Sequence, residues 1–353
     1  MDMLNILIVA TDRVNSGGVG SYISSITKNN QESNFYIAGN SNSDDLKLPF
    51  FELNIRYKAT NILLSIRSLL HIIASQKIDI IHAHTQRAAF LCCLAKLFKQ
   101  NIKIVYTPHG LRHTQLRTFT RIFHLMIEIF ILLFVNKVTT LTITEKRQIP
   151  IFKNKAISLK SHIEVHESIP IRSEHFHMQK ASTKIVMIGS LDKRKNPEFF
   201  IKVAKCLPNK RYSFLWVGDG ELMQECQTQI HQLGLENIKF IGQKPRSIVY
   251  SILKDSDIFL MTSKAEGFPL CILEAFFFKT AVISSEFLGV DEIITQGKTG
   301  WIYKDVDQAC TLIKNWELSV NREKIVDEAN TFVRDFVCRN EFQRRFNDVY
   351  RKI

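Results

Sequence analysis

The sequence lacks an apolar run long enough to cross a lipid bilayer. Its longest apolar segment, Ile122 to Val135, has 14 residues and contains His124 and Glu128, whereas a spanning helix needs about 20 apolar residues. The first apolar run, Leu4 to Ala10, follows the acidic Asp2 in place of a basic region and ends at strand length, which argues against a secretory signal. We therefore expect no transmembrane helix and a cytoplasmic protein.

The chain also lacks the cysteine and aromatic patterns of several protein classes. Its seven cysteines show neither the spacing of a disulfide framework nor a CxxC motif, which fits a reducing cytoplasm. No internal repeat or low-complexity tract is evident. Zinc-finger spacing, an RNP-like aromatic motif and a clear helix-turn-helix are absent, so we expect no nucleic acid partner.

Positive charge is concentrated in the first half of the chain. Residues 1–178 contain 21 Lys and Arg and 12 Asp and Glu, a net charge of +9, whereas residues 179–353 contain 26 and 22, a net charge of +4. A basic half can attract anionic lipid or a polyanionic acceptor. Residues 111–135 join bulky apolar side chains to Arg112, Arg117 and Arg121. This pattern fits a membrane-surface element, but the apolar Ile127 to Val135 favours a buried core helix.

Short apolar runs alternate with helical patterns along the chain, which is long enough for two domains. This rhythm predicts parallel sheets covered on both faces. The predicted strands are residues 4–10, 35–38, 78–83, 104–106, 138–143, 184–189, 212–217, 238–241, 258–261 and 281–284. Helical patterns cover 20–28, 62–75, 88–98 and 341–350. The chain is thus predicted to be α/β, with two doubly wound Rossmann-like domains at residues 1–175 and 180–335, a polar linker within 172–183, and a final helical segment at 336–353.

Two carboxylates flank a predicted loop-to-helix junction. Glu266 lies in the loop, Glu274 lies in the second turn of the helix predicted from Pro269 to Phe278, and Gly267 lies between them. The unpaired N–H groups of a helix N-terminus suit a phosphate, and glycine allows close backbone approach. Each carboxylate can accept hydrogen bonds from hydroxyl pairs, so one can hold a sugar and the other a ribose. A surface loop followed by an ordinary amphipathic helix is the alternative for an isolated pair of this kind.

Two further loops have a composition that suits phosphate. Gly17 to Gly20 follows the first strand and opens a helix, where glycines expose backbone N–H groups, although a flexible turn would look the same. Lys195 lies in the basic loop of residues 193–197 and could neutralise a departing diphosphate, with a solvated charge run as the alternative.

Two other polar motifs are open to a metal interpretation. His82 and His84 alternate on one strand face, and the lack of further ligands at recognisable spacing favours hydrogen-bonded histidines over a metal site. Asp255-Ser-Asp257 precedes a buried strand, where Asp257 is better suited to bonding local backbone.

In this order and spacing, the motifs resemble those of the retaining glycosyltransferases of family 4, which have the two-domain GT-B fold. The resemblance covers most of the chain. It is carried by residues 17–20, 80–84, 106–110, 189–196, 217–221, 266–274 and 297–300. Two positions depart from the family pattern: Ser190 stands where the family commonly has Arg, and Ser168 to Ile171 replaces an Asn-Gly-Ile-Asp segment before the linker.

The resemblance implies a site in a central cleft facing the carboxyl ends of the strands. The residues that it implies for catalysis are His109, Lys195 and Glu266. Those implied for donor binding are Gly18, Ser190, Lys195, Gly218, Gly242, Lys244, Glu266, Gly267, Phe268, Pro269, Leu270 and Glu274. Those implied for acceptor binding are Gly18, His109 and Gly110, with His113 on the surface of the acceptor loop. The final helix is expected to pack back on the N-terminal domain.

The implied activity is transfer of a hexosyl or N-acetylhexosaminyl group from a nucleotide-diphosphate sugar to a hydroxyl of a carbohydrate or polyprenyl-diphosphate-linked acceptor. Bacterial surface polysaccharide synthesis is the expected setting, with no cofactor and no essential metal. Peripheral contact with anionic lipid at the inner face of the plasma membrane is expected through the basic N-terminal domain. Two alternatives stay open: a nucleotide-sugar epimerase of the same fold, and a catalytically silent GT-B module in an assembly complex. The joint presence of Glu266, Glu274, Lys195 and His109 argues against the silent module.

Overall fold

The computed structural model describes residues 3–11, 17–40, 47–55, 59–115, 119–159, 162–163, 165, 183–207, 210–334, 336 and 339–353. Contacts divide the chain into unit 1, Met1–Glu164 with Cys338–Ile353, and unit 2, Val165–Val337. Each unit is described by itself. Residues 172–182 of the expected linker, the segment from Ser168 to Ile171, and Arg117 lie outside the described residues.

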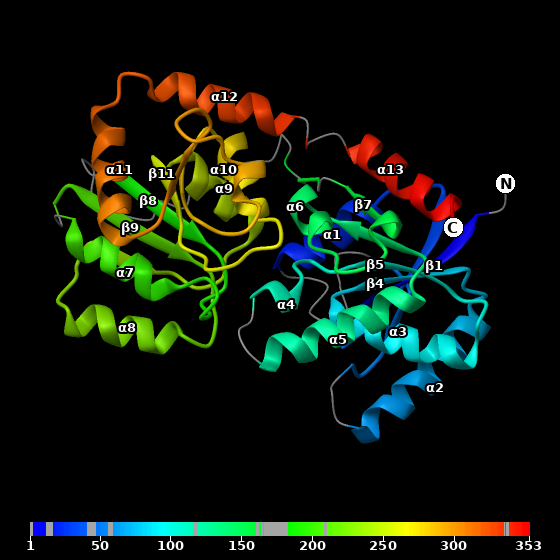
Figure 1. The fold of residues 1–353 in the computed structure, drawn as a ribbon. Coiled ribbons are helices and arrows are strands. Elements are labelled where there is room, and N and C mark those ends of the chain that lie inside the picture. Colours follow the sequence, from blue (N-terminus) through cyan, green and yellow to red (C-terminus); the bar gives the residue numbers. More distant parts are fainter. Residues whose placement is uncertain are drawn as a thin grey trace. The chain divides into compact units, whose positions relative to one another are not determined.

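Unit 1 is built on a seven-stranded parallel sheet with the strand order β3-β2-β1-β4-β5-β6-β7 (Figure 1). The strands are β1 (Leu4–Ala10), β2 (Ser33–Gly39), β3 (Phe50–Glu52), β4 (Ile80–His84), β5 (Lys103–Thr107), β6 (Lys137–Thr140) and β7 (Ala156–Ser158). The order runs outward from β1 to β3 and resumes on the other side of β1 with β4. In doubly wound folds, ligands bind beyond the carboxyl ends of the strands at such a reversal.

Helices cover both faces of this sheet (Figure 1). They are α1 (Gly17–Thr27), α2 (Ala59–Ser75), α3 (Gln86–Phe98), α4 (Arg112–Gln115), α5 (Phe119–Phe134), α6 (Ile143–Arg147) and α13 (Arg339–Arg351), with a 3-10 turn η1 (Lys153–Lys155). Side chains alternate along β4. Ile81 and Ala83 join the apolar core under α2, α3 and α5, whereas His82 and His84 meet aromatic side chains of α1 and α13 on the opposite face.

The final helix, α13, completes the end of α1. Gln343 donates to the carbonyl oxygens of Ser25 and Lys28 at 3.0 and 2.9 Å, and the carbonyls of a last helical turn have no partner within their own helix. Phe346 is fully buried, with its ring centroid 5.8 Å from that of Tyr22 and 5.7 Å from that of His82. A segment from the end of the sequence therefore belongs to the core of unit 1.

Unit 2 repeats the same topology with six parallel strands in the order β10-β9-β8-β11-β12-β13. The strands are β8 (Thr183–Ile188), β9 (Tyr212–Val217), β10 (Ile238–Phe240), β11 (Ile258–Met261), β12 (Ala281–Ser285) and β13 (Trp301–Tyr303). The helices are α7 (Pro197–Cys206), α8 (Met223–Gln232), α9 (Arg246–Lys254), α10 (Leu270–Phe277), α11 (Val306–Leu318) and α12 (Arg322–Arg334), with a 3-10 turn η2 (Val290–Glu292). Here the order reverses between β8 and β11.

The two-sheet α/β fold predicted from the sequence is confirmed, and the differences lie at element ends. The predicted strand 138–143 is too long, because Thr142 caps α6 by accepting the backbone N–H of Glu145 at 2.9 Å, which ends the strand. Helix α1 begins at Gly17 rather than Gly20, and Pro269 precedes α10 as its N-cap. The strands β3, β7 and β13 were not predicted.

The core helix expected at Ile127 to Val135 is buried on one side of α5 only. Ile127, Ile131 and Leu132 are buried, but Leu133 is 55% exposed. Among the described residues no helix combines the length and apolarity that crossing a bilayer requires.

Replacing Phe346 by alanine tests the role of α13 in the core of unit 1. Loss of a fully buried phenylalanine should cost about 3–5 kcal/mol of unfolding free energy, measured by urea unfolding. Arg345→Ala on the same helix is the control, because its ion pair with Glu341 is exposed and should contribute about 0–1 kcal/mol. Equal effects of the two substitutions would contradict the packing described.

Candidate active site

Two loops of unit 2 leave the sheet where its strand order reverses. The first follows β8 and carries Ser190 to Asn196, and the second follows β11 and carries Ser263 to Pro269. The Thr262 hydroxyl donates to the carbonyl oxygen of Lys195 at 2.8 Å, and the N–H of Lys264 donates to that of Arg194 at 2.8 Å. The two loops are therefore fixed to each other by hydrogen bonds at the carboxyl ends of neighbouring strands.

The predicted residues Lys195 and Glu266 meet directly between these loops. Lys195 Nζ lies 2.7 Å from Glu266 Oε1, and Arg194 Nη1 lies 3.0 Å from Oε2. The side chains of Lys195 and Glu266 are only 10% and 7% exposed. Burial by itself raises the pKa of Glu266, but the charges of Lys195 and Arg194 outweigh it and hold that pKa below its ordinary value. Glu266 is thus a carboxylate shared by two cations.

Asp192 holds the basic loop in shape. Its Oδ1 accepts the backbone N–H of Lys195 at 2.9 Å, and its Oδ2 accepts the hydroxyl hydrogen of Ser190 at 2.7 Å. Partial burial raises the pKa of Asp192, but these hydrogen bonds and the neighbouring cations lower it overall. The Ser190 hydroxyl, expected from the sequence to donate to a ligand, donates to Asp192. Sequence reasoning did not assign Asp192, although an aspartate three residues before the lysine is a typical loop-bonding position.

Two glycines allow the close packing behind Lys195. A Cβ atom at Gly189 would lie 3.1 Å from Lys195 Cε, so the glycine makes room for the lysine stem. Gly218 has φ +143°, and a Cβ there would lie 2.0 Å from the carbonyl oxygen of Gly189. The N–H of Gly218 donates to the carbonyl oxygen of Gly242 at 2.9 Å. The predicted residues Gly218 and Gly242 are therefore adjacent, at the ends of β9 and β10.

Glu274 has a separate set of partners within unit 2. It projects from α10 with its side chain 10% exposed, and its Oε1 lies 3.3 Å from Arg246 Nη2 and 3.4 Å from the Tyr250 hydroxyl, both on α9. Sequence reasoning missed Arg246. Its position directly after Lys244 and Pro245, at the start of a helix, was the available signal.

The remaining predicted donor residues lie around the start of α10 and after β10. Pro269 and Leu270 are buried, whereas Gly267 and Phe268 are half-buried. The Phe268 ring stacks on Phe336, with centroids 6.0 Å apart. Lys244 is half-buried in the segment between β10 and α9.

In unit 1, three histidines line one face of the sheet. His82 Nδ1 lies 2.7 Å from the Tyr350 hydroxyl, and its Nε2 lies 2.7 Å from Thr107 Oγ1. His84 Nδ1 lies 2.8 Å from His109 Nε2. Burial lowers the pKa of His82 and of His109 to about 3, with a further contribution to His82 from His109. These histidines are neutral hydrogen-bonding groups at physiological pH.

A buried carboxylate holds the turn after β5. His109 and Gly110 both have positive φ, 56° and 103°, a conformation unfavourable for histidine. Glu145 Oε1 accepts the N–H of Gly110 at 2.7 Å, and Oε2 accepts the N–H of Leu141 at 2.9 Å. Glu145 was not predicted from the sequence, although Thr142-Ile-Thr-Glu145 has the spacing of a capping box.

Two other predicted positions lie in unit 1. Gly18 is exposed in the first turn of α1, with open space where a Cβ would be. His113, expected at the surface, is instead only 6% exposed, so that expectation is wrong. Its pKa is lowered, first by burial and then by Arg121 and His124.

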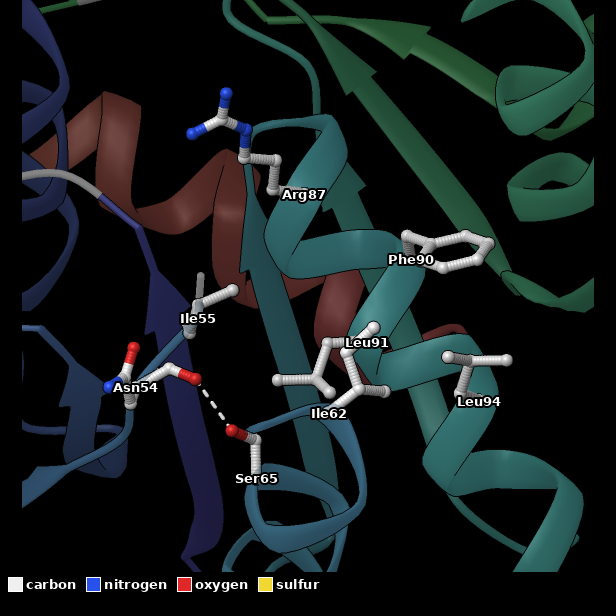
Figure 2. Close-up of a pocket in the computed structure, with 8 residues that line it drawn as sticks. All are labelled: Asn54, Ile55, Ile62, Ser65, Arg87, Phe90, Leu91 and Leu94. Atoms are coloured by element: carbon white, nitrogen blue, oxygen red, sulfur yellow. Dashed lines mark hydrogen bonds between the residues drawn. The ribbon is translucent and has the colours of Figure 1, made fainter. Parts of the chain in front are cut away.

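A small pocket in unit 1 lies between α2 and α3. Figure 2 shows Ile62 and Leu91 facing each other across it, with Arg87 at the N-terminal end of α3. None of the predicted site residues lines it. Across the described part of the chain, no cluster of three or more His, Cys, Asp or Glu side chains is placed to hold a metal ion.

Comparison with known protein families now assigns the two halves of this fold. Residues 171–329 match the family described as glycosyl transferases group 1, and residues 29–150 match glycosyltransferase family 4. The chain is a GT-B glycosyltransferase. Together the two matches cover most of the chain, as did the resemblance carried by the motifs.

Individual relatives of this glycosyltransferase are distant but span most of it. A protein of the Klebsiella pneumoniae cps region is 25% identical and covers 87% of this chain and 89% of its own. The Escherichia coli UDP-Gal:alpha-D-GlcNAc-diphosphoundecaprenol alpha-1,3-galactosyltransferase is 24% identical, with 81% and 76% covered. The structure of Anabaena Alr3699/HepE with UDP-glucose has a TM-score of 0.86 at 16% identity, covering 99% and 100%. At that identity the structural likeness shows the shared fold.

Replacing His82 tests whether the buried histidines make stability depend on pH. The unfolded chain takes up a proton near pH 6.5, but the folded state keeps His82 neutral down to about pH 3. The contribution of the neutral histidine to the free energy of unfolding is therefore complete above pH 6.5. Below pH 6.5 the free energy of unfolding falls by up to about 1.4 kcal/mol per pH unit for each such histidine. His82→Gln should make the decline between pH 7.5 and 5 shallower in urea unfolding. His231→Gln, at an exposed position, should leave the decline unchanged; an unaltered slope in His82→Gln would refute the assignment.

Proposed function

We propose that this enzyme is a retaining, metal-independent glycosyltransferase that transfers a sugar from a nucleotide-diphosphate donor. The observation that carries the proposal is the Lys195 and Glu266 pair, buried between two loops where the strand order of unit 2 reverses. In this fold a ligand binds at that edge of the sheet. A positive charge fixed there stabilises the diphosphate as it leaves.

The donor lies across the loops of unit 2. Glu274 binds the ribose hydroxyls, Glu266 binds a hydroxyl of the transferred sugar, and backbone from Gly267 to Leu270 receives the diphosphate near the start of α10. Ser190, Gly218, Gly242 and Lys244 border the nucleotide. Arg246 keeps the Glu274 carboxylate oriented from α9. The names of the Escherichia coli relative and of the Anabaena complex support a uridine nucleotide as donor.

Transfer follows a front-face course with no covalent enzyme intermediate. The leaving phosphate helps to deprotonate the acceptor hydroxyl, while the site stabilises the oxocarbenium-like centre. Lys195 and the neighbouring Arg194 supply positive charge in place of the arginine that the family commonly has at Ser190. His109, Gly110 and Gly18 of unit 1 contact the acceptor or the transferred sugar.

The acceptor is a polyprenyl-diphosphate-linked saccharide used in surface polysaccharide synthesis. The names of relatives support this class: the Escherichia coli enzyme acts on a diphosphoundecaprenol-linked sugar, and a Campylobacter jejuni relative, 29% identical over 43% of this chain, acts on an undecaprenol-linked saccharide. An acceptor of this kind supports a reaction at the cytoplasmic face of the membrane.

Unit 1 has a surface suited to that location. Phe119, Ile122, Phe123 and Met126 recur at helical spacing on α5 and are between 56% and 87% exposed. We call these four side chains the α5 apolar face. Exposed apolar residues grouped in this way are typical of a binding surface.

Basic side chains lie near the first turns of α5. Arg121 is exposed on α5 itself, and Arg112 is exposed on α4, the preceding helix. Partial burial lowers the pKa of His124, and the charges of Arg112 and Arg87 lower it further, which places both arginines near this helix. Apolar residues beside arginines fit the interface of an anionic bilayer. Peripheral attachment through α5 would bring the enzyme to a lipid-linked acceptor.

Donor binding and catalysis can be tested with two variants. UDP-, GDP-, ADP-, dTDP- and CMP-sugars are screened for thermal stabilisation, and one class should raise Tm. Glu274→Ala should abolish that shift, whereas Lys195→Met should lower kcat by roughly 10²–10³-fold with a smaller change in donor KM. Lys193→Met, at an exposed position in the same loop, is the matched control and should keep near-native turnover.

The products separate transfer from the alternatives. Free nucleotide diphosphate formed only with acceptor indicates transfer, whereas a new nucleotide sugar indicates epimerisation. Native turnover in both Glu274→Ala and Lys195→Met would contradict the site assignment. If no nucleotide sugar raised the Tm of the native protein, a catalytically silent module would be favoured.

Membrane attachment through α5 can be tested by co-sedimentation with vesicles. Binding to vesicles of mixed anionic and zwitterionic lipid should fall roughly tenfold in a Phe119→Ser, Phe123→Ser double variant and in Arg121→Glu, because apolar burial and charge attraction both contribute. Lys28→Glu, exposed at the end of α1, makes the same charge change on the other face of the sheet and should bind normally. If the first two variants bound vesicles as the native protein does, the α5 apolar face would be excluded as the membrane-binding surface. If instead these variants lost self-association, the α5 apolar face would be assigned to contact with a second copy of the chain.

A further inference from the structure

One nitrogen of His84 is buried without a partner. His84 Nδ1 lies 2.8 Å from His109 Nε2, but among the described residues no group bonds its Nε2, which is out of contact with solvent. A buried polar atom without a partner is costly. The cost depends on whether that nitrogen carries a hydrogen.

The two histidines share a single proton along their hydrogen bond. Burial lowers the pKa of His109 to about 3 and that of His84 well below its ordinary value, with smaller contributions to His84 from the other two histidines. Both rings are therefore neutral, and each carries one N–H. Either His84 Nδ1–H donates to His109 Nε2, or His109 Nε2–H donates to His84 Nδ1.

The two arrangements leave different groups unpaired. If His84 donates, its buried Nε2 is a bare acceptor, and His109 carries its hydrogen on Nδ1. If His109 donates, the buried Nε2 of His84 carries an N–H with nothing to receive it, and His109 Nδ1 is bare. Buried N–H groups without a partner are rarer in folded proteins than unpaired acceptors. The first arrangement is therefore favoured.

We propose that His84 is a positioning residue that fixes the tautomer of His109, so that His109 offers an Nδ1–H donor to the ligand. This inference rests on the proposed function in taking that ligand to be the transferred sugar or the acceptor. His109 is half-buried, and its Nδ1 bonds no group among the described residues. A donor there bonds a sugar oxygen or a phosphate oxygen, whereas a bare nitrogen accepts only from a hydroxyl.

The surroundings of His109 keep its ring from turning over. The left-handed backbone at His109 is held through Gly110 by Glu145, and Tyr22 of α1 packs edge-on against the ring with centroids 5.0 Å apart. The titratable side chains around His109 are thus His82 and His84 on β4, Tyr22 on α1 and Glu145 on α6. Only His84 bonds the imidazole itself among the described residues.

The tautomer can be observed without any substrate. In native protein labelled with ¹⁵N-histidine, long-range ¹H–¹⁵N correlation spectra should show His109 and His84 each protonated on Nδ1. Signals are assigned by their loss in His109→Gln and His84→Asn. The exposed His231 should show the Nε2–H tautomer that free imidazole side chains favour in water. A His109 signal of the Nε2–H form would overturn the proposal, whatever the reaction proves to be.

Two nearly isosteric variants test the functional consequence. The amide of His84→Asn can still donate to His109 Nε2, whereas the carboxylate of His84→Asp can only accept. His84→Asp should therefore force the opposite tautomer and lower kcat at least tenfold more than His84→Asn. It should also raise the pKa of His109, so activity relative to native enzyme should recover as the pH falls and His109 again carries Nδ1–H.

The variants separate this proposal from a structural role. A purely structural His84 would make both variants lose activity in parallel with Tm and without recovery at low pH, and that result would refute the proposal. The spectra of the native protein decide the tautomer even where His84→Asp fails to fold. An Nδ1–H tautomer combined with full activity in His109→Gln would keep the tautomer assignment and remove the role of His109 in the reaction.

Discussion

The ion pair between Lys195 and Glu266 is the interaction on which the site in unit 2 depends. Neither group would be stable if it were buried alone, because each would be an uncompensated charge out of water. Together they fix the loop after β8 to the loop after β11. Asp192 accepts the backbone N–H of Lys195, and Gly189 leaves space for the lysine side chain. The site is therefore preorganised by charge, and its geometry is inseparable from the sheet that places the two loops side by side.

Much of this arrangement could be predicted from the sequence. Buried parallel strands such as β1, β9 and β11 are largely apolar runs that end at polar loops. The positions of these strands, and of the loops that carry Lys195, Glu266 and His109, could therefore be predicted. The strands β3, β7 and β13 were missed because each has three residues and lies at a sheet edge, too short for a periodic pattern.

The missing parts of the site share a physical cause. Asp192, Glu145 and Arg246 act through contacts with backbone groups or side chains from other segments, and the chain alone does not show which segments meet. The exposed side of α5 could not be predicted for a related reason. An all-apolar segment predicts burial, but the number of faces that a helix buries depends on how many neighbours it has.

The place of α13 has a consequence for how the protein is made. Unit 1 is discontinuous in sequence, and its last piece follows the whole of unit 2. The partners that α13 supplies are synthesised after unit 2. They are Phe346 for Tyr22, Tyr350 for His82 and Gln343 for the carbonyls at the end of α1. Unit 1 is therefore incomplete, with an uncovered aromatic surface, until the ribosome has passed unit 2 and α13. Completion of the core of unit 1 is thereby tied to translation of α13, so a chain that ended before α13 would expose this aromatic surface to chaperones or proteases.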